Sequence, residues 1–131
     1  MTEFTQATEI AAAIAAGRTT ATATINACLD RIDRLNPALN AFTAVLADRA
    51  RARAAALDAS GAPKGPLSGV PFAVKNLIDI ASLATLAGSK INRDHQPAAQ
   101  DAPLVARLEE AGAILVGALN MGEYAYDFTG E

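Results

Sequence analysis

The sequence predicts an α/β protein in which a mainly helical N-terminal region, residues 1–62, leads into the start of an α/β core in residues 63–131. Residues before about 60 are rich in alanine, and their apolar side chains recur at helical spacing. From Gly65 onward, short β-type runs alternate with loops and helices. The order strand, helix, strand predicts that Val70–Val74 and Ile114–Leu119 are parallel neighbours in one sheet.

The first predicted helix runs from Thr5 to Ala16. Ile10 and Ile14 lie four residues apart, on one face of such a helix. Gly17 follows and can adopt the left-handed conformation that commonly ends helices.

A second helix is predicted from an N-cap at Thr20 to about Leu35, with Asn36-Pro37 ending it. Four residues within it have the i, i+3, i+4, i+7 spacing of a buried stripe. They are Ile25, Cys28, Leu29 and Ile32. We interpret the lone cysteine as a small core residue, and it excludes an intramolecular disulfide.

Residues Asn40–Val45 favour an extended segment, and Ala47–Ala59 is strongly helix-prone. The basic residues of this helix, Arg49, Arg51 and Arg53, are expected to form a solvated face.

Beyond the Val70–Val74 strand, Asp101 is expected to cap a helix that has Pro103 in its first turn. Leu104, Val105 and Leu108 would form its apolar face, and Gly112 would end it. After the Ile114–Leu119 strand, Asn120 is expected to cap a short helix that reaches Tyr126.

Composition excludes several classes of function. The net charge of −3 argues against a nucleic-acid surface, which needs a basic face. One histidine, His95, lies among polar loop residues, so a zinc site or a Ser-His-Asp triad within the chain is not expected. No apolar run reaches the length of a membrane span, and we expect a soluble, cytoplasmic protein without metal or cofactor.

Lys75 is the most informative residue, because it ends the apolar run Val70–Val74. One interpretation is a surface lysine whose amine reaches water. The other is a catalytic amine, because removal from water favours the neutral form that can act as a base.

The sequence around Lys75 resembles the amidase signature family, and four further segments follow in that family's order. The matching segments are Gly65–Asp79, Thr85–Ser89, Asp101–Leu108, Gly112–Gly117 and Asn120–Ala125. Residues 8–62 are similar to the family's helical N-terminal region. The resemblance implies a mixed sheet covered by helices and hydrolysis of amide-type C–N bonds by a Ser–cis-Ser–Lys triad, with Lys75 as the lysine.

The same resemblance implies that both catalytic serines lie beyond Glu131, so the chain alone would be inactive. Asn76 departs from the aspartate that the family more often has after the lysine. Met121 matches a segment that lines the family's substrate pocket, although it could equally be a core residue. The other candidate substrate contacts are Tyr124 and Tyr126, which Asp127 and Thr129 follow. A homodimer, with or without a small companion subunit, is the assembly implied.

Two branches of the family remain open. Residues 74–77 and 86–91 are similar to the branch that includes the 1-carboxybiuret hydrolases of s-triazine catabolism, which act on small amide or urea-type substrates. The alternative is the branch of the glutamyl-tRNA(Gln) amidotransferase subunits that release ammonia from glutamine, for which nucleic acid would become a partner. A third hypothesis, from another class, is a non-catalytic interaction module derived from an amidase.

Overall fold

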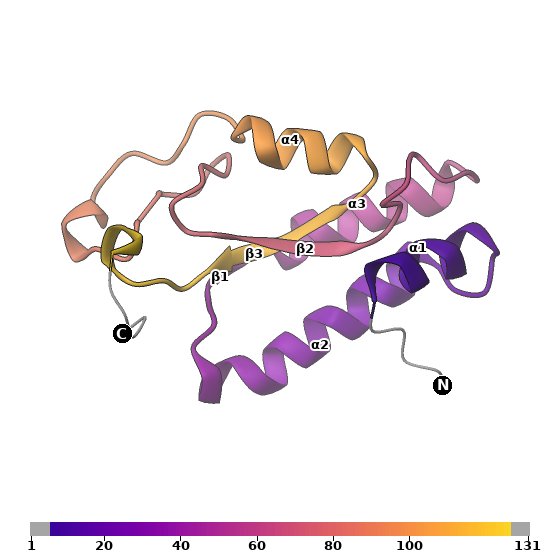
Figure 1. The fold of residues 1–131 in the computed structure, drawn as a ribbon, viewed down its shortest axis with the longest axis horizontal. Helices are drawn as coiled ribbons and strands as arrows, with labels where there is room; N and C mark the ends of the chain where they lie inside the picture. The colour runs from indigo at the N-terminus through magenta and orange to yellow at the C-terminus, as the bar shows by residue number, and fades with distance from the viewer. Residues whose placement is uncertain (1–5, 127–131) are drawn as a thin grey trace.

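The computed structural model describes residues 6–126, in which a three-stranded mixed sheet lies between two helical layers (Figure 1). The α-helices are α1 (Ala7–Ala15), α2 (Ala21–Leu39), α3 (Ala47–Ala59) and α4 (Pro103–Glu110). The strands are β1 (Phe42–Val45), β2 (Pro71–Lys75) and β3 (Ile114–Leu119). Two 3₁₀ turns, η1 (Lys90–Asn92) and η2 (Glu123–Ala125), lie together at one end of the molecule.

The strand order is β1-β3-β2, with β3 in the centre. β2 pairs with β3 in parallel, which confirms the predicted arrangement, and β1 pairs with β3 antiparallel. β2 starts one residue later than predicted, at Pro71, because proline lacks the N–H that a ladder interior requires. β2 is an edge strand among the described residues, so its backbone pairs on one side only.

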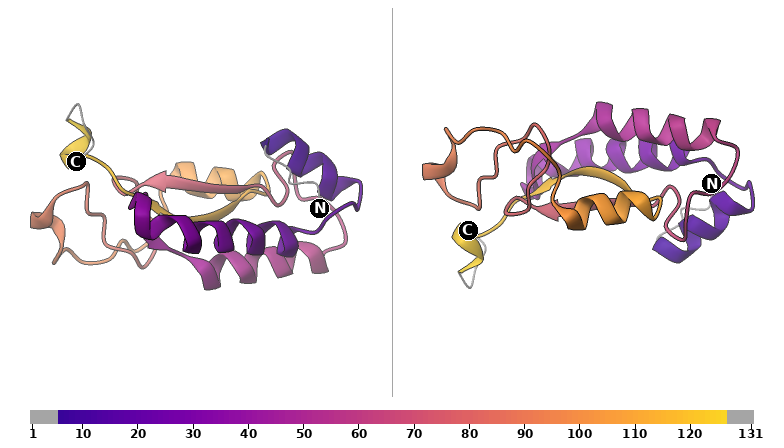
Figure 2. Two further views of the ribbon diagram at one scale, coloured as in Figure 1. Left: turned by 90° about the horizontal axis from the view of Figure 1, so that it is seen from below. Right: turned by 90° about the horizontal axis from the view of Figure 1, so that it is seen from above.

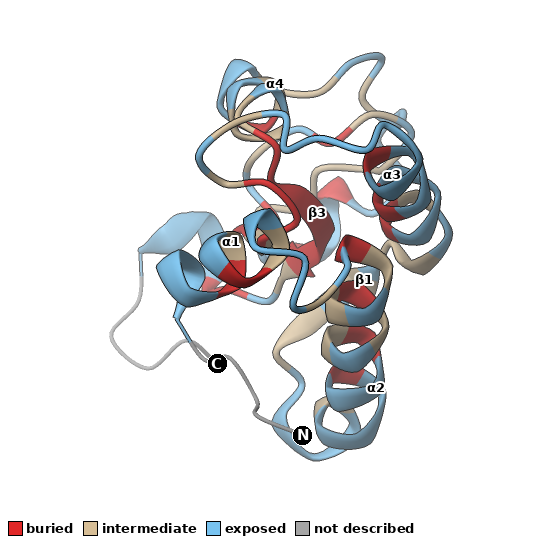
Figure 3. Cartoon of the chain, turned by 90° about the vertical axis from the view of Figure 1, so that its right-hand side faces the viewer, coloured by how far each residue is buried: buried red, intermediate tan, exposed pale blue. Residues whose placement is uncertain are grey.

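α2 and α3 cover one face of the sheet and α4 covers the other (Figure 2). The first core unites α2, α3 and β3, and its members include Ile25, Leu29, Ala54 and Ile114. The second joins β2, β3 and α4 through Val74, Leu115 and Val105. β3 is therefore buried from both sides (Figure 3).

An irregularity in β3 changes which residues face each core. Phe72 pairs with Leu115, but Ala73 pairs with Gly117, so Val116 is passed over. Leu115 and Ala118 consequently both contact the α4 core despite their odd spacing. This β-bulge lies beside the segment that ends at Lys75.

The predicted end of α2 at Asn36-Pro37 is wrong, since the helix continues to Leu39 with Pro37 in its last turn. Asn40 ends it in the left-handed conformation (φ 49°). The Asn36 side chain accepts a hydrogen bond from the amide of Phe42 at 2.8 Å and donates to the Phe42 carbonyl at 3.3 Å, which fixes the turn into β1. The chain thus leaves the helix without needing the proline as its stop.

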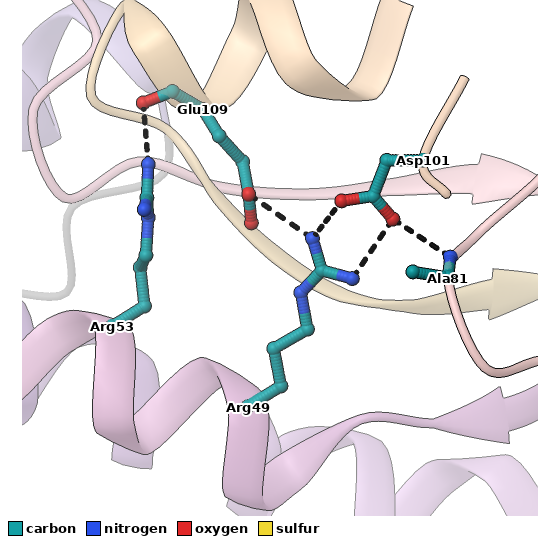
Figure 4. A network of polar contacts seen from close by, with 5 residues as sticks. All are labelled: Arg49, Arg53, Ala81, Asp101 and Glu109. Carbon is teal, nitrogen blue, oxygen red and sulfur yellow. Dashed lines mark hydrogen bonds and ion pairs between the residues drawn. The ribbon is translucent and has the colours of Figure 1, made fainter. Parts of the chain in front are cut away.

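Asp101 was predicted to cap α4, but Ala102 is the N-cap residue and no side chain caps this helix. The Asp101 carboxylate instead accepts two hydrogen bonds from Arg49 on α3, at 3.0 and 2.6 Å, and one from the amide of Ala81 at 2.8 Å (Figure 4). A charged bidentate guanidinium binds a carboxylate more strongly than the neutral amides of a helix end do. Leu104 is half exposed rather than part of the apolar face, which Val105 forms.

The expectation of a solvated arginine face on α3 is wrong for Arg49, which is only partly exposed, whereas Arg51 and Arg53 are exposed as predicted. Besides binding Asp101, Arg49 contacts Glu109 at 3.0 Å, and Arg53 donates to the Glu109 carbonyl at 2.9 Å. The hydrogen bonds from Arg49 lower the pKa of Asp101, against the opposing effect of partial burial, and the same pair raises the pKa of the guanidinium. These contacts join α3 to α4 at the edge of the sheet (Figure 4).

Asp58, near the end of α3, supplies a second contact between helices that the sequence did not predict. Its carboxylate accepts hydrogen bonds from the first amides of α2, those of Ala21 at 2.8 Å and Thr22 at 2.9 Å. Burial opposes ionisation here, but the hydrogen bonds from Thr22 and Ala21 prevail and lower the pKa of Asp58. Thr20 caps the same helix as predicted, accepting from the amide of Ala23 at 3.1 Å.

Cys28 packs against the α2–α3 core, as predicted, and its burial raises the pKa of the thiol. His95 is exposed in a loop, which is also as predicted. Over residues 6–126, no helix has the length and apolar character needed to cross a membrane.

Candidate functional site

Lys75 is the last residue of β2 and pairs with Leu119, the last residue of β3. Because the two strands are parallel, their carboxyl ends lie at the same edge of the sheet, which is where ligands commonly bind in α/β proteins. The Lys75 side chain is exposed among the described residues, so the burial expected from its apolar approach is not observed. Within residues 6–126 its strand lies at the edge of the sheet, and the residue before it, Val74, faces the core.

The residue after Lys75 is far more enclosed. Asn76 is 3% exposed, and its amide nitrogen Nδ2 donates to the Thr43 hydroxyl on β1 at 2.8 Å. Its oxygen Oδ1 accepts from the amide of Leu86 at 3.0 Å. The backbone of Asn76 donates to the Leu119 carbonyl at 3.0 Å and accepts from the amide of Ala87 at 2.7 Å. Its side chain and its backbone therefore both have donor and acceptor partners.

The loop after β2 folds back onto the segment after β3. The Ser89 hydroxyl donates to Glu123, and the amide of Tyr124 donates to the Ala87 carbonyl at 2.7 Å. Buried Asn92 donates to the Tyr124 hydroxyl at 3.1 Å. The two segments therefore form one wall beside the carboxyl ends of β2 and β3.

Gly88 allows this close approach. Its φ is +70°, and a Cβ built on it would lie 2.7 Å from the carbonyl oxygen of Met121 and 2.8 Å from the backbone of Gly122. Any other residue would push the loop away from residues 121–122.

The three predicted substrate contacts lie in this wall but in different environments. Met121 is 7% exposed, so its side chain is part of the interior, as the core interpretation expects. The Tyr124 side chain is half exposed and its hydroxyl bonds to Asn92, whereas Tyr126 is 92% exposed. Asp127 and Thr129 lie outside the described residues.

The short helix expected from Asn120 to Tyr126 is only the 3₁₀ turn η2, because Tyr124 and Ala125 have left-handed φ values of 50° and 57°. Asn120 does not cap it; its side chain donates to the Asn40 carbonyl at 3.0 Å and accepts from the amide of Met121 at 2.9 Å. Asn120 thus anchors the wall to the turn between α2 and β1.

A groove of about 490 Å³ lies elsewhere, between α2, the end of β1 and the start of α3. Its lining residues include Leu29, Ile32, Val45 and Arg51, and none of the predicted site residues is among them. In the described residues, no group of three or more His, Cys, Asp or Glu side chains is arranged to hold a metal ion.

The hydrogen bonds of Thr43 and Asn76 around the end of β2 were not predicted from the sequence. One signal was present: Asn76 is a polar residue between apolar residues Val74 and Ile78. A buried amide in such a run requires partners for both its donor and its acceptor.

The mixed sheet, with α2 and α3 on one face and α4 on the other, makes this an α/β protein with a lysine at the carboxyl end of a parallel strand. The family model described as Amidase matches residues 23–131. The chain belongs to the amidase family.

Among curated relatives, the chain is 52% identical over 126 residues to AtzE, a component of the 1-carboxybiuret hydrolase of Pseudomonas sp. (strain ADP), covering 94% of this chain and 28% of that protein. It is 43% identical over 119 residues to a component of the glutamyl-tRNA(Gln) amidotransferase of Oleidesulfovibrio alaskensis, covering 90% and 24%. The chain therefore spans about a quarter of the length of these relatives.

Solved structures agree with the fold. The chain matches a structure of a vestigial protein complex, described as revealing the origins of an s-triazine catabolic enzyme, with a TM-score of 0.91 and 50% identity. That match covers 95% of this chain and 28% of the other. The native peptide amidase of Stenotrophomonas maltophilia matches with a TM-score of 0.82 and 36% identity, over 93% of this chain and 26% of that one. The predicted amidase-signature fold and mixed sheet are confirmed.

Proposed function

We propose that the protein carrying this chain is an amidohydrolase that cleaves the C–N bond of a small amide or urea-type substrate, with Lys75 in its catalytic triad. The chain would be the N-terminal part of a single amidase-signature domain, and both serines would follow Glu131. The substrate we favour is 1-carboxybiuret, because of the 52% identity to a component of that hydrolase. The proposal is carried by the position of Lys75 at the carboxyl end of β2, in a chain of which 94% matches this relative.

The chemistry requires one group to move protons. A serine oxygen attacks the carbonyl carbon and loses its proton, and the C–N bond breaks after the leaving nitrogen gains one. In the proposed triad, the Lys75 amine takes the proton through the second serine and later returns it to the nitrogen. Water then repeats the attack on the acyl-enzyme and releases the acid, which restores the serine.

The wall formed by residues 85–92 and 120–126 would border the substrate. We propose that Tyr124 and Tyr126 contact it directly, because both side chains are at least half exposed beside the strand ends. Met121 would act from beneath, shaping the pocket floor through its buried side chain.

The test is Lys75→Ala in the complete protein. We expect the turnover of amide substrate to fall on the order of 10⁴-fold, as for removal of a triad member, without loss of folding. Lys75→Arg should be equally inactive, because a guanidinium keeps its proton. Lys64→Ala, which removes an exposed lysine before β2, is the matched control and should retain full activity. Activity of Lys75→Ala within tenfold of wild type would contradict the proposal.

The second candidate is the amidotransferase component that releases ammonia from glutamine, supported by the 43% identity to a protein of that enzyme. The two functions separate in one experiment with the purified complete protein. Hydrolysis of 1-carboxybiuret without glutaminase activity supports the first, and glutaminase activity that depends on partner proteins supports the second.

We propose that the complete protein forms a homodimer, with or without a small companion subunit; the description of the related s-triazine enzyme as part of a protein complex supports an assembly of more than one chain. Size-exclusion chromatography with light scattering on the natively purified protein tests this.

A further inference from the structure

We propose that Asn76 is the positioning residue of the site: its side chain, hydrogen-bonded to Thr43 across the sheet, fixes the backbone from which Lys75 projects. The inference rests on the proposed function, since it concerns where the catalytic amine is held.

β2 is weakly held at Lys75 in the part of the chain that the structure describes. Within residues 6–126, the ladder hydrogen bonds at Lys75 come from β3. The Lys75 side chain is exposed there, so contacts of the neighbouring residue have a large share in defining where its backbone lies.

Asn76 connects the three strands and the loop after β2. Its Nδ2 reaches past β3 to the Thr43 hydroxyl on β1, and that hydroxyl lies 3.3 Å from the Ala118 carbonyl on β3, to which it donates. Its Oδ1 holds the amide of Leu86 in the returning loop. The three strands and the loop are thereby joined at the residue that follows Lys75.

Loss of the hydrogen bonds of Asn76 would leave buried polar groups without partners. Asn76 is 3% exposed, so its amide cannot turn to water if a partner is removed. A buried donor without an acceptor is unfavourable enough to move the backbone around it. A displacement of about 1 Å at a catalytic group can reduce the rate about 10²-fold. Asn76 also binds Leu86 in the wall, so its loss should change both kcat and KM. The Thr43 hydroxyl contacts Asn76 and the Ala118 carbonyl outside the wall, so its loss should lower kcat with KM unchanged.

The experiment compares two changes at Thr43, a residue distant from Lys75 in sequence and on another strand, in the complete protein. Thr43→Val has nearly the same shape but removes the hydroxyl, and we expect kcat to fall about 3- to 10-fold, the effect of one lost hydrogen bond. Thr43→Ser keeps the hydroxyl and should have the kcat of the wild type. Asn76→Ala should reduce kcat by about 10- to 100-fold.

A double variant provides the decisive readout. If the two residues act through their shared hydrogen bond, Thr43→Val should have no further effect on kcat in the Asn76→Ala background. Independent, multiplying effects would overturn the proposal. If Asn76→Ala does not fold, the contrast between Thr43→Val and Thr43→Ser decides alone: equal kcat values in these two variants overturn it.

Ser68→Ala controls for a general loss of stability. Ser68 is 1% exposed and accepts a hydrogen bond from the amide of Lys64 at 2.9 Å, at the opposite end of β2. Its loss should lower the melting temperature without changing kcat, whereas a fall in kcat equal to that of Thr43→Val would overturn the proposal. Lys75→Ala distinguishes failure of the proposed function from failure of the positioning role. If Lys75→Ala remains active, the proposed function is wrong. If it is inactive while Thr43→Val has the kcat of the wild type, only the positioning role of Asn76 is wrong.

Discussion

Removing the charge of Asp101 should loosen the junction between the loop after β2, the segment before α4 and α3. Asp101→Asn keeps the size of the side chain but replaces a carboxylate that receives two hydrogen bonds from Arg49 and one from the amide of Ala81. Arg49 keeps only Glu109 as a charged partner in this network. Since Ala81 lies in the loop and Arg49 on α3, the change should act locally at this junction (Figure 4).

The magnitude follows from the exposure of the pair. The side chains of Arg49 and Asp101 are 29% and 20% exposed, which lies between a surface ion pair and a buried one. Surface pairs contribute about 0–1 kcal/mol, and breaking a buried pair costs about 3–5 kcal/mol. We therefore expect a loss of about 2 kcal/mol, which corresponds to about 30-fold faster exchange of the local amides if they exchange by local opening.

Hydrogen exchange with mass spectrometry on the complete protein measures this directly, in peptides that contain Ala81 and α4. Asp94→Asn is the matched control, because Asp94 is exposed in a loop. Protection of the Ala81 region that is equal in Asp101→Asn and wild type would refute the reasoning.

The same contact should depend on pH in a defined direction. Because the hydrogen bonds from Arg49 lower the pKa of Asp101 in the folded protein, the stabilisation is complete above the ordinary value of about 3.9. It should decline below that value and disappear as pH falls through the lowered pKa. In Asp101→Asn this acid-dependent part of the protection should be absent.

Two further predictions concern stability. Asp58→Ala should lower the free energy of unfolding by about 1 kcal/mol, because the amides of Ala21 and Thr22 lose their acceptor. The stability of Asp58→Asn should lie between those of the wild type and Asp58→Ala. A melting temperature of Asp58→Ala equal to that of the wild type would contradict the capping role. Gly88→Ala should lower the melting temperature more than Gly61→Ala. Both glycines have a φ near +70°, but of these two only Gly88 would bring a Cβ against backbone atoms. Equal effects of the two substitutions would exclude the close backbone approach at Gly88 as the cause.

The sequence predicted those parts of the fold that depend on local pattern. The buried stripe of α2 and the apolar strand β3 have a periodicity that one-dimensional reasoning can detect, and both are where they were expected. The position of Lys75 at the end of β2 followed from the apolar run before it.

The two errors have different physical causes. Asp101 is a residue type that commonly caps helices, but it binds Arg49, which is 52 residues away in the sequence. Sequence pattern alone cannot reveal such a partner, because it depends on which elements are packed together. Pro37 remains helical because local contacts of Asn36, with Asn40 and Phe42, complete the turn after it.

The role proposed for Asn76 depends on its being an amide and not a carboxylate. A carboxylate at position 76 could accept from the amide of Leu86, but it could not donate to the Thr43 hydroxyl as Nδ2 does. Thr43 would then have to turn its own hydroxyl toward position 76 and give up the Ala118 carbonyl. An asparagine instead satisfies Thr43, Leu86 and the β3 carbonyl together without adding a negative charge next to Lys75. The amide therefore joins the strand end to β1 and to the loop after β2.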